Sequence, residues 1–125
     1  MIGFKALSIF TAALALILFL SLLFVPEPIF FIFQLTETGS AFFIARRAAM
    51  LFLGIAILSW LGRAQPHSQS RQSICMGLGV MMLGLACLGL FEYLRGFAGP
   101  GIGLAVITEA IIGVAYLKIW FVHRQ

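Results

Sequence analysis

The stretch FKALSIFTAALALILFLSLLFV, residues 4–25, decides the fold of this chain. It carries a single charge, on Lys5, and its other polar side chains are small hydroxyls. A helix needs about 20 consecutive apolar residues to cross the ~30 Å hydrocarbon core of a bilayer. This run exceeds the roughly 7 to 15 apolar residues of a signal peptide, and no small-residue cleavage motif follows it, so we expect a retained transmembrane helix.

Three more runs of this kind follow the first. Of the 125 residues, 62% are hydrophobic and 10% are charged, whereas an ordinary soluble domain has about 25% charged residues. A soluble fold of this size could not cover so much apolar surface. The sequence therefore predicts an all-α fold in a single integral membrane domain, residues 1–125. We expect a four-transmembrane-helix antiparallel bundle, with spans at about 4–25, 41–61, 73–94 and 101–122.

The joints between the spans are of two kinds. Residues 62–72 and 96–100 are polar or rich in Gly and Pro, which predicts that consecutive helices pack as antiparallel neighbours. The first joint begins with PEP, residues 26–28, which ends the first helix, and continues as IFFIFQL, residues 29–35. This segment is too short to cross a bilayer. We expect it to lie as a short interfacial segment between the first two helices, the alternative being a partly buried loop packed on the bundle.

The charged residues predict the orientation of the chain. The net charge of +4 is scattered between apolar runs and forms no basic patch, which argues against nucleic-acid binding. One side of the membrane receives five basic residues and no acid: Lys5, Arg63, Arg71, Lys118 and Arg124. The other side receives three acids and three bases: Glu27, Glu37, Arg46, Arg47, Glu92 and Arg95. The positive-inside rule then places both termini in the cytoplasm.

Glu109 is the main candidate for a functional polar residue, because it falls near the bilayer centre in the fourth span, where a carboxylate facing lipid is costly. The residues Gly101, Ala105, Glu109 and Gly113 recur every four positions. Such a stripe of small residues lets another helix approach closely. We therefore expect Glu109 to face a neighbouring helix, with Gly101, Ala105 and Gly113 in the packing contact.

Two arginines are plausible partners for this carboxylate. Arg46 and Arg47 lie one to two turns into the second span, and one of them can face the bundle while the other extends toward the headgroups. The pair with Glu109 is then either a structural ion pair that fixes helix register or a proton, ion or polar-substrate site. Glu92 and Arg95 read as a local i, i+3 surface pair. The alternative is an outward-facing vestibule, with Glu109 and the arginines, for a small charged substrate or a quinone headgroup.

The third span is rich in glycine, at Gly77, Gly79, Gly84 and Gly89. This density predicts close approach of other helices on more than one face, with Gly77 and Gly84 among the packing positions. Contacts within the chain and contacts between subunits both remain open. We therefore expect a homo-oligomer or an association with other membrane protein subunits, within the lipid bilayer.

The sequence offers no set of catalytic, haem or metal-binding residues. His67 and His123 both fall on the cytoplasmic rim, so they cannot supply the two mid-membrane imidazoles that a transmembrane haem needs. No cluster of His, Cys and carboxylate ligands has the spacing of a catalytic metal site. Cys75 and Cys87 would lie roughly 18 Å apart along one helix, too far for a disulfide. We expect no cofactor, no metal and no catalytic residue.

One resemblance supports the topology. The second span reads ARR at residues 45–47, LG at 53–54 and SWLGR at 59–63. This pattern resembles small uncharacterised four-helix bacterial inner-membrane proteins, in which an Ala-Arg opens the span, glycines punctuate it and an aromatic-x-x-Arg closes it. The third span departs from the pattern because it lacks a polar residue near its middle. The resemblance implies the fold, the topology and the bacterial inner (cytoplasmic) membrane, but no activity.

Two functions follow as hypotheses. The first is a non-enzymatic structural or accessory membrane protein that associates through its glycine-rich helices. The alternative is a small transporter or proton-coupled carrier that uses Glu109 with Arg46 and Arg47. The small multidrug exporters are four-helix proteins of similar length with a carboxylate inside the first span, and the first span of this chain holds no acid.

Overall fold

A computed structural model describes residues 3–124, and this part of the chain contains helices and no strand. The five helices are α1 (Phe4–Phe24), α2 (Glu27–Phe33), α3 (Gly39–Leu61), α4 (Gln69–Leu94) and α5 (Ile102–His123). All except α2 are long and apolar enough to cross a membrane. The all-α fold with four such helices, predicted from the sequence, is confirmed.

Side-chain caps place the starts of two long helices slightly earlier than the apolar runs indicate. Thr38 Oγ1 accepts a hydrogen bond of 3.1 Å from the backbone N–H of Ala41 and caps α3. Ser68 Oγ accepts one of 3.2 Å from the N–H of Arg71 and caps α4. Hydroxyl caps of this kind satisfy backbone donors that the first helical turn leaves free. As a result, α4 begins within the polar segment that precedes the apolar run.

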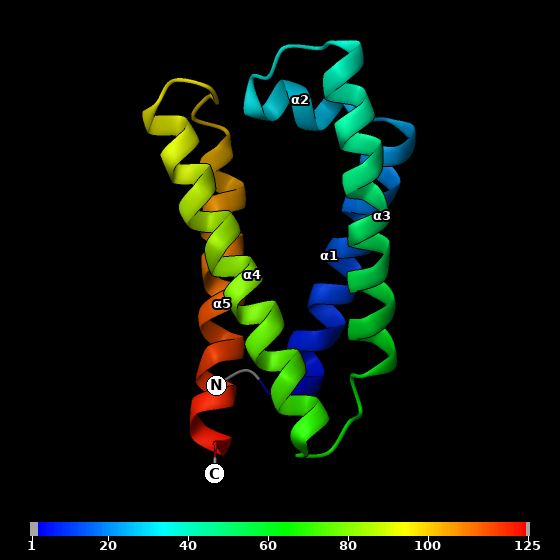
Figure 1. The fold of residues 1–125 in the computed structure, drawn as a ribbon, viewed down its shortest axis with the longest axis vertical. Coiled ribbons are helices and arrows are strands. Elements are labelled where there is room, and N and C mark those ends of the chain that lie inside the picture. The colour runs from blue at the N-terminus through cyan, green and yellow to red at the C-terminus, as the bar shows by residue number, and fades with distance from the viewer. Residues whose placement is uncertain (1–2, 125) are drawn as a thin grey trace.

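The segment after the first span forms a helix of its own. Proline at the first positions of α2 fits a helix start, because those backbone N–H groups have no partner within the helix. Phe30 is buried and stacks on Phe42 of α3, with ring centroids 5.1 Å apart, whereas Phe31 is 82% exposed. α2 lies across the end of the molecule opposite the two termini (Figure 1). The segment is therefore a short apolar helix, one face of which packs on α3 while the other exposes Phe31 and Ile32.

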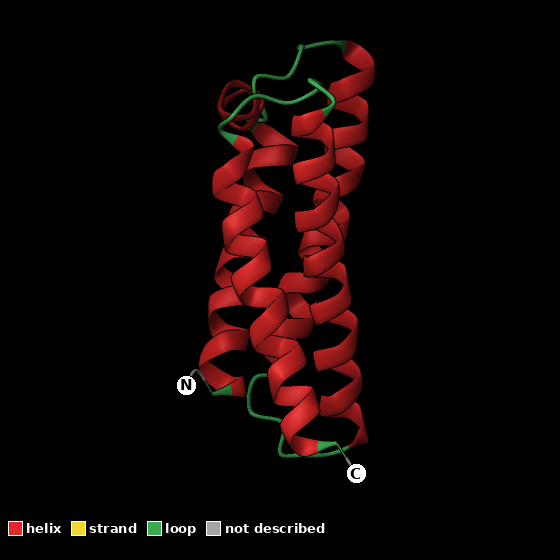
Figure 2. Ribbon diagram, turned by 90° about the vertical axis from the view of Figure 1, so that its left-hand side faces the viewer, coloured by secondary structure: helices red, strands yellow, loops and turns green. Residues whose placement is uncertain are grey.

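The four long helices form two antiparallel pairs. α1 packs along α3, α4 packs along α5, and the two pairs meet mainly through α1 and α5 (Figures 1 and 2). The expectation that all consecutive helices pack as neighbours is wrong for α3 and α4, which do not pack along their lengths although a short loop joins them. The reason is the start of α1, where Phe4 and Leu7 pack with Cys75, Leu78 and Tyr116 in one buried cluster.

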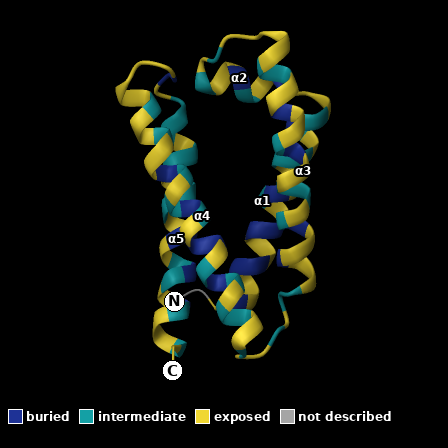
Figure 3. Ribbon diagram, in the orientation of Figure 1, coloured by how far each residue is buried: buried dark blue, intermediate teal, exposed yellow. Residues whose placement is uncertain are grey.

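The interior is divided in the same way. One cluster of buried residues joins α1, α4 and α5 near the termini, and a second, around Leu22, Phe30, Ala45 and Ala49, joins α1, α2 and α3. Outside these clusters, large apolar side chains such as Leu51 and Leu104 are exposed along the long helices (Figure 3). An apolar exterior of this extent fits lipid and does not fit water.

A second contact joins the two pairs at the α2 end. The N–H of Gly99 donates a hydrogen bond of 2.7 Å to the carbonyl oxygen of Phe33. Gly101 lies so close to the carbonyl group of Ile32 that a Cβ at this position would overlap it. The loop before α5 is thus fixed to the end of α2 by backbone contacts that only glycine permits.

Candidate functional site

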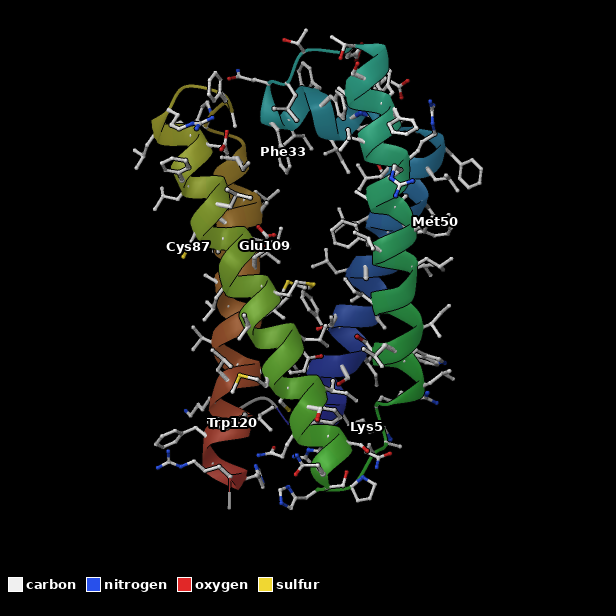
Figure 4. All side chains as sticks on the ribbon, in the orientation of Figure 1. Lys5, Phe33, Met50, Cys87, Glu109 and Trp120 are labelled. Atoms are coloured by element: carbon white, nitrogen blue, oxygen red, sulfur yellow. The ribbon has the colours of Figure 1, made fainter. Side chains whose placement is uncertain are left out.

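Glu109 lies on the side of α5 that faces the other helix pair (Figure 4). Ile112 and Tyr116 follow it at i+3 and i+7, positions on the same face of a helix, and both are fully buried. Glu109 itself is half-buried, and within residues 3–124 it takes part in no salt bridge and no side-chain hydrogen bond. Its carboxyl group therefore continues the α1-facing stripe of α5 without a protein partner.

The structure does not bring the two candidate arginines to this carboxyl group. Arg46 and Arg47 are exposed on α3, and the guanidinium of Arg47 lies 6.0 Å from the centroid of the Phe43 ring. The ion pair with Glu109 is not formed, because α3 packs on α1 whereas α5 packs on α4. Arg46 and Arg47 thus do not pair with Glu109 because their helix packs elsewhere, and not because they lie at a different depth along the bundle.

Glu92 and Arg95 form a local pair at the end of α4. Their closest side-chain atoms, Oε2 and Nη2, are 3.4 Å apart, and both side chains are partly exposed. Arg95 also lies over the rings of Phe91 and Phe97, with 5.0 and 4.4 Å to the ring centroids. Exposed pairs of this kind contribute about 0 to 1 kcal/mol. No salt bridge or side-chain hydrogen bond joins this pair to Glu109 within the described residues, and a common vestibule of these groups stays a prediction.

A buried group of hydroxyls at the junction of the helix pairs was not anticipated from the sequence. The Tyr116 hydroxyl donates to Thr11 Oγ1 at 3.2 Å, and Ser8 Oγ lies 3.4 Å from the same hydroxyl. Ser59 approaches it from α3, yet Ser59 Oγ has no hydrogen-bond partner within residues 3–124. All four side chains are essentially inaccessible. The sequence could have indicated this group through one property: in antiparallel spans, residues 8, 59 and 116 lie at similar depths in the membrane.

The glycines and alanine selected from the sequence fall into two groups. A Cβ at Gly113 would lie 2.8 Å from Leu83 Cγ, so this glycine makes the α4–α5 contact; Gly101 contacts α2, and Ala105 is half-buried on α5. Gly77 and Gly84 are different, because a Cβ at either meets nothing within 4 Å. They contact no other helix of the described chain, and their role in packing stays a prediction about contacts with another molecule.

Gly77 and Gly84 belong to a regular stripe on the outer side of α4, which we call the α4 outer face. Its members alternate at spacings of three and four residues, and all are exposed: Ser70, Ser73, Gly77, Val80, Gly84 and Cys87. Figure 4 shows Cys87 on the side of α4 that points away from the rest of the molecule. An alternation of three and four is the heptad spacing of helices that pack side by side with a left-handed twist.

Comparisons with known proteins assign the chain to no family. The sequence matches no protein-family model, no curated protein and no solved structure. Within residues 3–124, no group of three or more His, Cys, Asp or Glu side chains is placed to hold a metal ion.

Proposed function

We propose that this protein is a non-enzymatic structural or accessory subunit of a membrane assembly, and that it associates through the α4 outer face. The first partner to consider is a second copy of the chain. The observation that carries the proposal is the exposed stripe at heptad spacing, in which a Cβ at Gly77 or Gly84 would meet no atom of the described chain within 4 Å.

The physics of lipid supports this reading of the α4 outer face. Lipid tails are as apolar as leucine, so helices gain little from hiding apolar side chains and associate instead where small residues permit close backbone packing. The heptad spacing favours a crossing angle of about +20°. Two copies inserted in the same orientation are related by a twofold axis along the membrane normal, so that the two α4 helices would run parallel.

Not every exposed glycine lies in such a stripe. Gly54 on α3 is exposed and a Cβ there meets nothing within 4 Å. Its neighbours on the same face, at three and four residues either side, are large: Met50, Leu51, Ile57 and Leu58. A helix could not approach Gly54 as closely, which makes it a matched control position for the glycines of α4.

The proposal places the protein in the bacterial inner membrane with both termini in the cytoplasm. Both chain ends lie at the same end of the molecule (Figure 1). The unbalanced basic residues belong to this end, in the helix ends and the α3–α4 loop: Lys5, Arg63, Arg71, Lys118 and Arg124. Basic residues next to spans are retained on the cytoplasmic side.

Self-association is tested by energy transfer between fluorescently labelled chains in lipid vesicles. The double variant Gly77→Leu/Gly84→Leu is expected to lower the association constant at least about tenfold, because each leucine separates the two backbones. Gly54→Leu should leave it unchanged. Equal association of all three proteins, or no association of the unaltered chain at any protein-to-lipid ratio, would contradict self-association.

A second candidate function rests on Glu109. Its half-buried carboxyl group has no salt bridge and no side-chain hydrogen bond in the described chain, and it lies on the side of α5 that faces the other helix pair (Figure 4). A lone intramembrane carboxyl group is typical of proton-coupled carriers. In this alternative Glu109 exchanges a proton during transport, and Arg46 and Arg47 would have to approach it in another conformation.

Proteoliposomes test the carrier alternative. A pH gradient should drive flux of an added ion or small cation, Glu109→Gln should abolish that flux, and Glu92→Gln should retain it. Flux that is absent, or equal in the two variants, would remove the carrier from consideration.

A further inference from the structure

The two histidines of the chain, His67 and His123, lie next to each other. His67 belongs to the loop between α3 and α4, and His123 is the last residue of α5. Their ring centroids are 5.3 Å apart, and the ring planes are inclined by 36°. Figure 1 shows that this loop and the end of α5 lie at the same end of the molecule. The chain contains no other histidine, so both of its imidazole side chains lie at this point.

One hydrogen bond fixes which nitrogen of His123 is available. Nδ1 of His123 lies 2.9 Å from the carbonyl oxygen of Ile119. A carbonyl oxygen can only accept, so Nδ1 carries the proton and Nε2 of the neutral ring keeps its lone pair. Histidines that bind metals are commonly oriented in this way, by an N–H to carbonyl bond from the nitrogen that does not bind the metal.

The position of His67 is fixed by its neighbours. Gln65 Nε2 donates to Ser68 Oγ at 3.1 Å, and the same hydroxyl caps α4. Gln72, one turn into α4, donates from Nε2 to the carbonyl oxygen of Trp120 at 3.0 Å. The Gln72–Trp120 bond joins the first turn of α4 to the last turn of α5, and the bonds of Ser68 order the loop segment next to His67.

The separation of the rings fits shared coordination of one ion. A metal ion lies about 2.0–2.1 Å from an imidazole nitrogen, so two rings bound to one ion at roughly tetrahedral angles have centroids about 5 Å apart. We propose that His67 and His123 form a binding site for a divalent transition-metal ion, with Cu²⁺ bound more tightly than Zn²⁺. The site would clip the α3–α4 loop to the end of α5. This proposal does not depend on how α4 associates.

The surroundings select the class of ion. No third His, Cys or carboxylate ligand lies with the two rings within residues 3–124. Hard cations such as Ca²⁺ and Mg²⁺ require several oxygen ligands, which this site does not supply. The guanidinium of Arg124, next to His123 in the chain, lies over the Phe121 ring, 4.0 Å from its centroid. Two neutral nitrogens with water in the remaining positions suit Cu²⁺ best among the divalent first-row ions.

The test is a Cu²⁺ titration of the purified full chain, produced without a histidine tag and in a Cys87→Ser background that removes the exposed thiol. Electron paramagnetic resonance then counts the bound imidazoles. The unaltered pair should bind one Cu²⁺ per chain through two imidazole nitrogens, and Zn²⁺ more weakly by calorimetry. His67→Ala and His123→Ala should each raise the Kd at least about tenfold, since even loss of an outer-shell partner costs that much.

Gln69→Ala is the matched control, because it alters an exposed position at the start of α4 and leaves both rings in place. Its Kd should equal that of the parent protein. Circular dichroism verifies the helix content of every variant, and His67→Ala carries the test alone if His123→Ala loses helix, since His67 is an exposed loop residue. Binding through one imidazole or none, half a Cu²⁺ per chain, or an unchanged Kd in His67→Ala would each overturn the proposal.

Discussion

The two faces of α4 use glycine in opposite ways. On the inner face, a Cβ at Gly79 would lie 2.7 Å from the side chain of Leu117, and one at Gly89 would lie 3.0 Å from Val106. On the outer face, a Cβ at Gly77 or Gly84 meets nothing within 4 Å. The inner glycines let α5 pack closely, whereas the outer glycines have no neighbour from another helix of the described chain. Glycines of one helix thus have two different surroundings: those of the inner face form the contact with α5, and those of the outer face are open to a partner that we propose.

A substitution on the inner face of α4 should change the stability of the chain most. Gly79→Leu places a bulky side chain where Leu117 already packs, and Gly113 O lies 3.3 Å from the added Cβ. Overpacking of this kind costs about 1 to 3 kcal/mol. We expect Gly79→Leu to lower the free energy of unfolding in detergent by about 3 kcal/mol. A stability equal to that of Gly77→Leu would show that the two faces do not differ.

The buried hydroxyl side chains at the junction of the two helix pairs should have an intermediate effect on stability. Tyr116→Phe removes the hydroxyl that contacts Thr11 and Ser8, and we expect it to lower the unfolding free energy by about 1 kcal/mol. Ser59→Ala removes an oxygen without a partner, so it should be neutral or stabilising. Denaturant unfolding of both variants measures this; a larger loss in Ser59→Ala than in Tyr116→Phe would refute the arrangement.

Substitutions on the outer face of α4 should change the stability of the isolated chain least. Gly77→Ala and Gly84→Ala add a methyl group in open space, and alanine stabilises a helix interior by about 0.5 to 1 kcal/mol relative to glycine. Each variant should therefore raise the unfolding free energy slightly when the protein is dilute in excess detergent. A loss of stability under these conditions would place these positions in a contact within the chain.

The sequence predicted the four long helices because length and hydropathy are local properties. It could not predict which face of α4 meets α5: Gly77 and Gly79 point about 200° apart around a helix, and both carry the same signal. The absence of an ion pair between Glu109 and the two arginines could not be predicted for a related reason. The depth of Arg46 and Arg47 could be counted along the chain, but the packing of α3 on α1 rather than beside α5 could not.

The same limit applies to the polar groups that were found only in the structure. Ser8 and Tyr116 meet because the start of α1 packs against α4 and α5 through Phe4 and Leu7, and no single sequence motif indicates this packing. His67 and His123 were placed on one side of the membrane from the sequence, yet their contact depends on the rotation of α5 about its axis.

Oxidative cross-linking of the unaltered protein in membranes tests whether two copies associate through the α4 outer face. Cys87 is exposed on that face whereas Cys75 is buried, and a disulfide requires Cα atoms roughly 4.4–6.8 Å apart. Two parallel α4 helices in close contact should yield a cross-linked dimer that Cys87→Ser and Gly77→Leu/Gly84→Leu both abolish. Equal cross-linking in a Cys87→Ser/Leu104→Cys variant, with its thiol on the exposed face of α5, would contradict the claim.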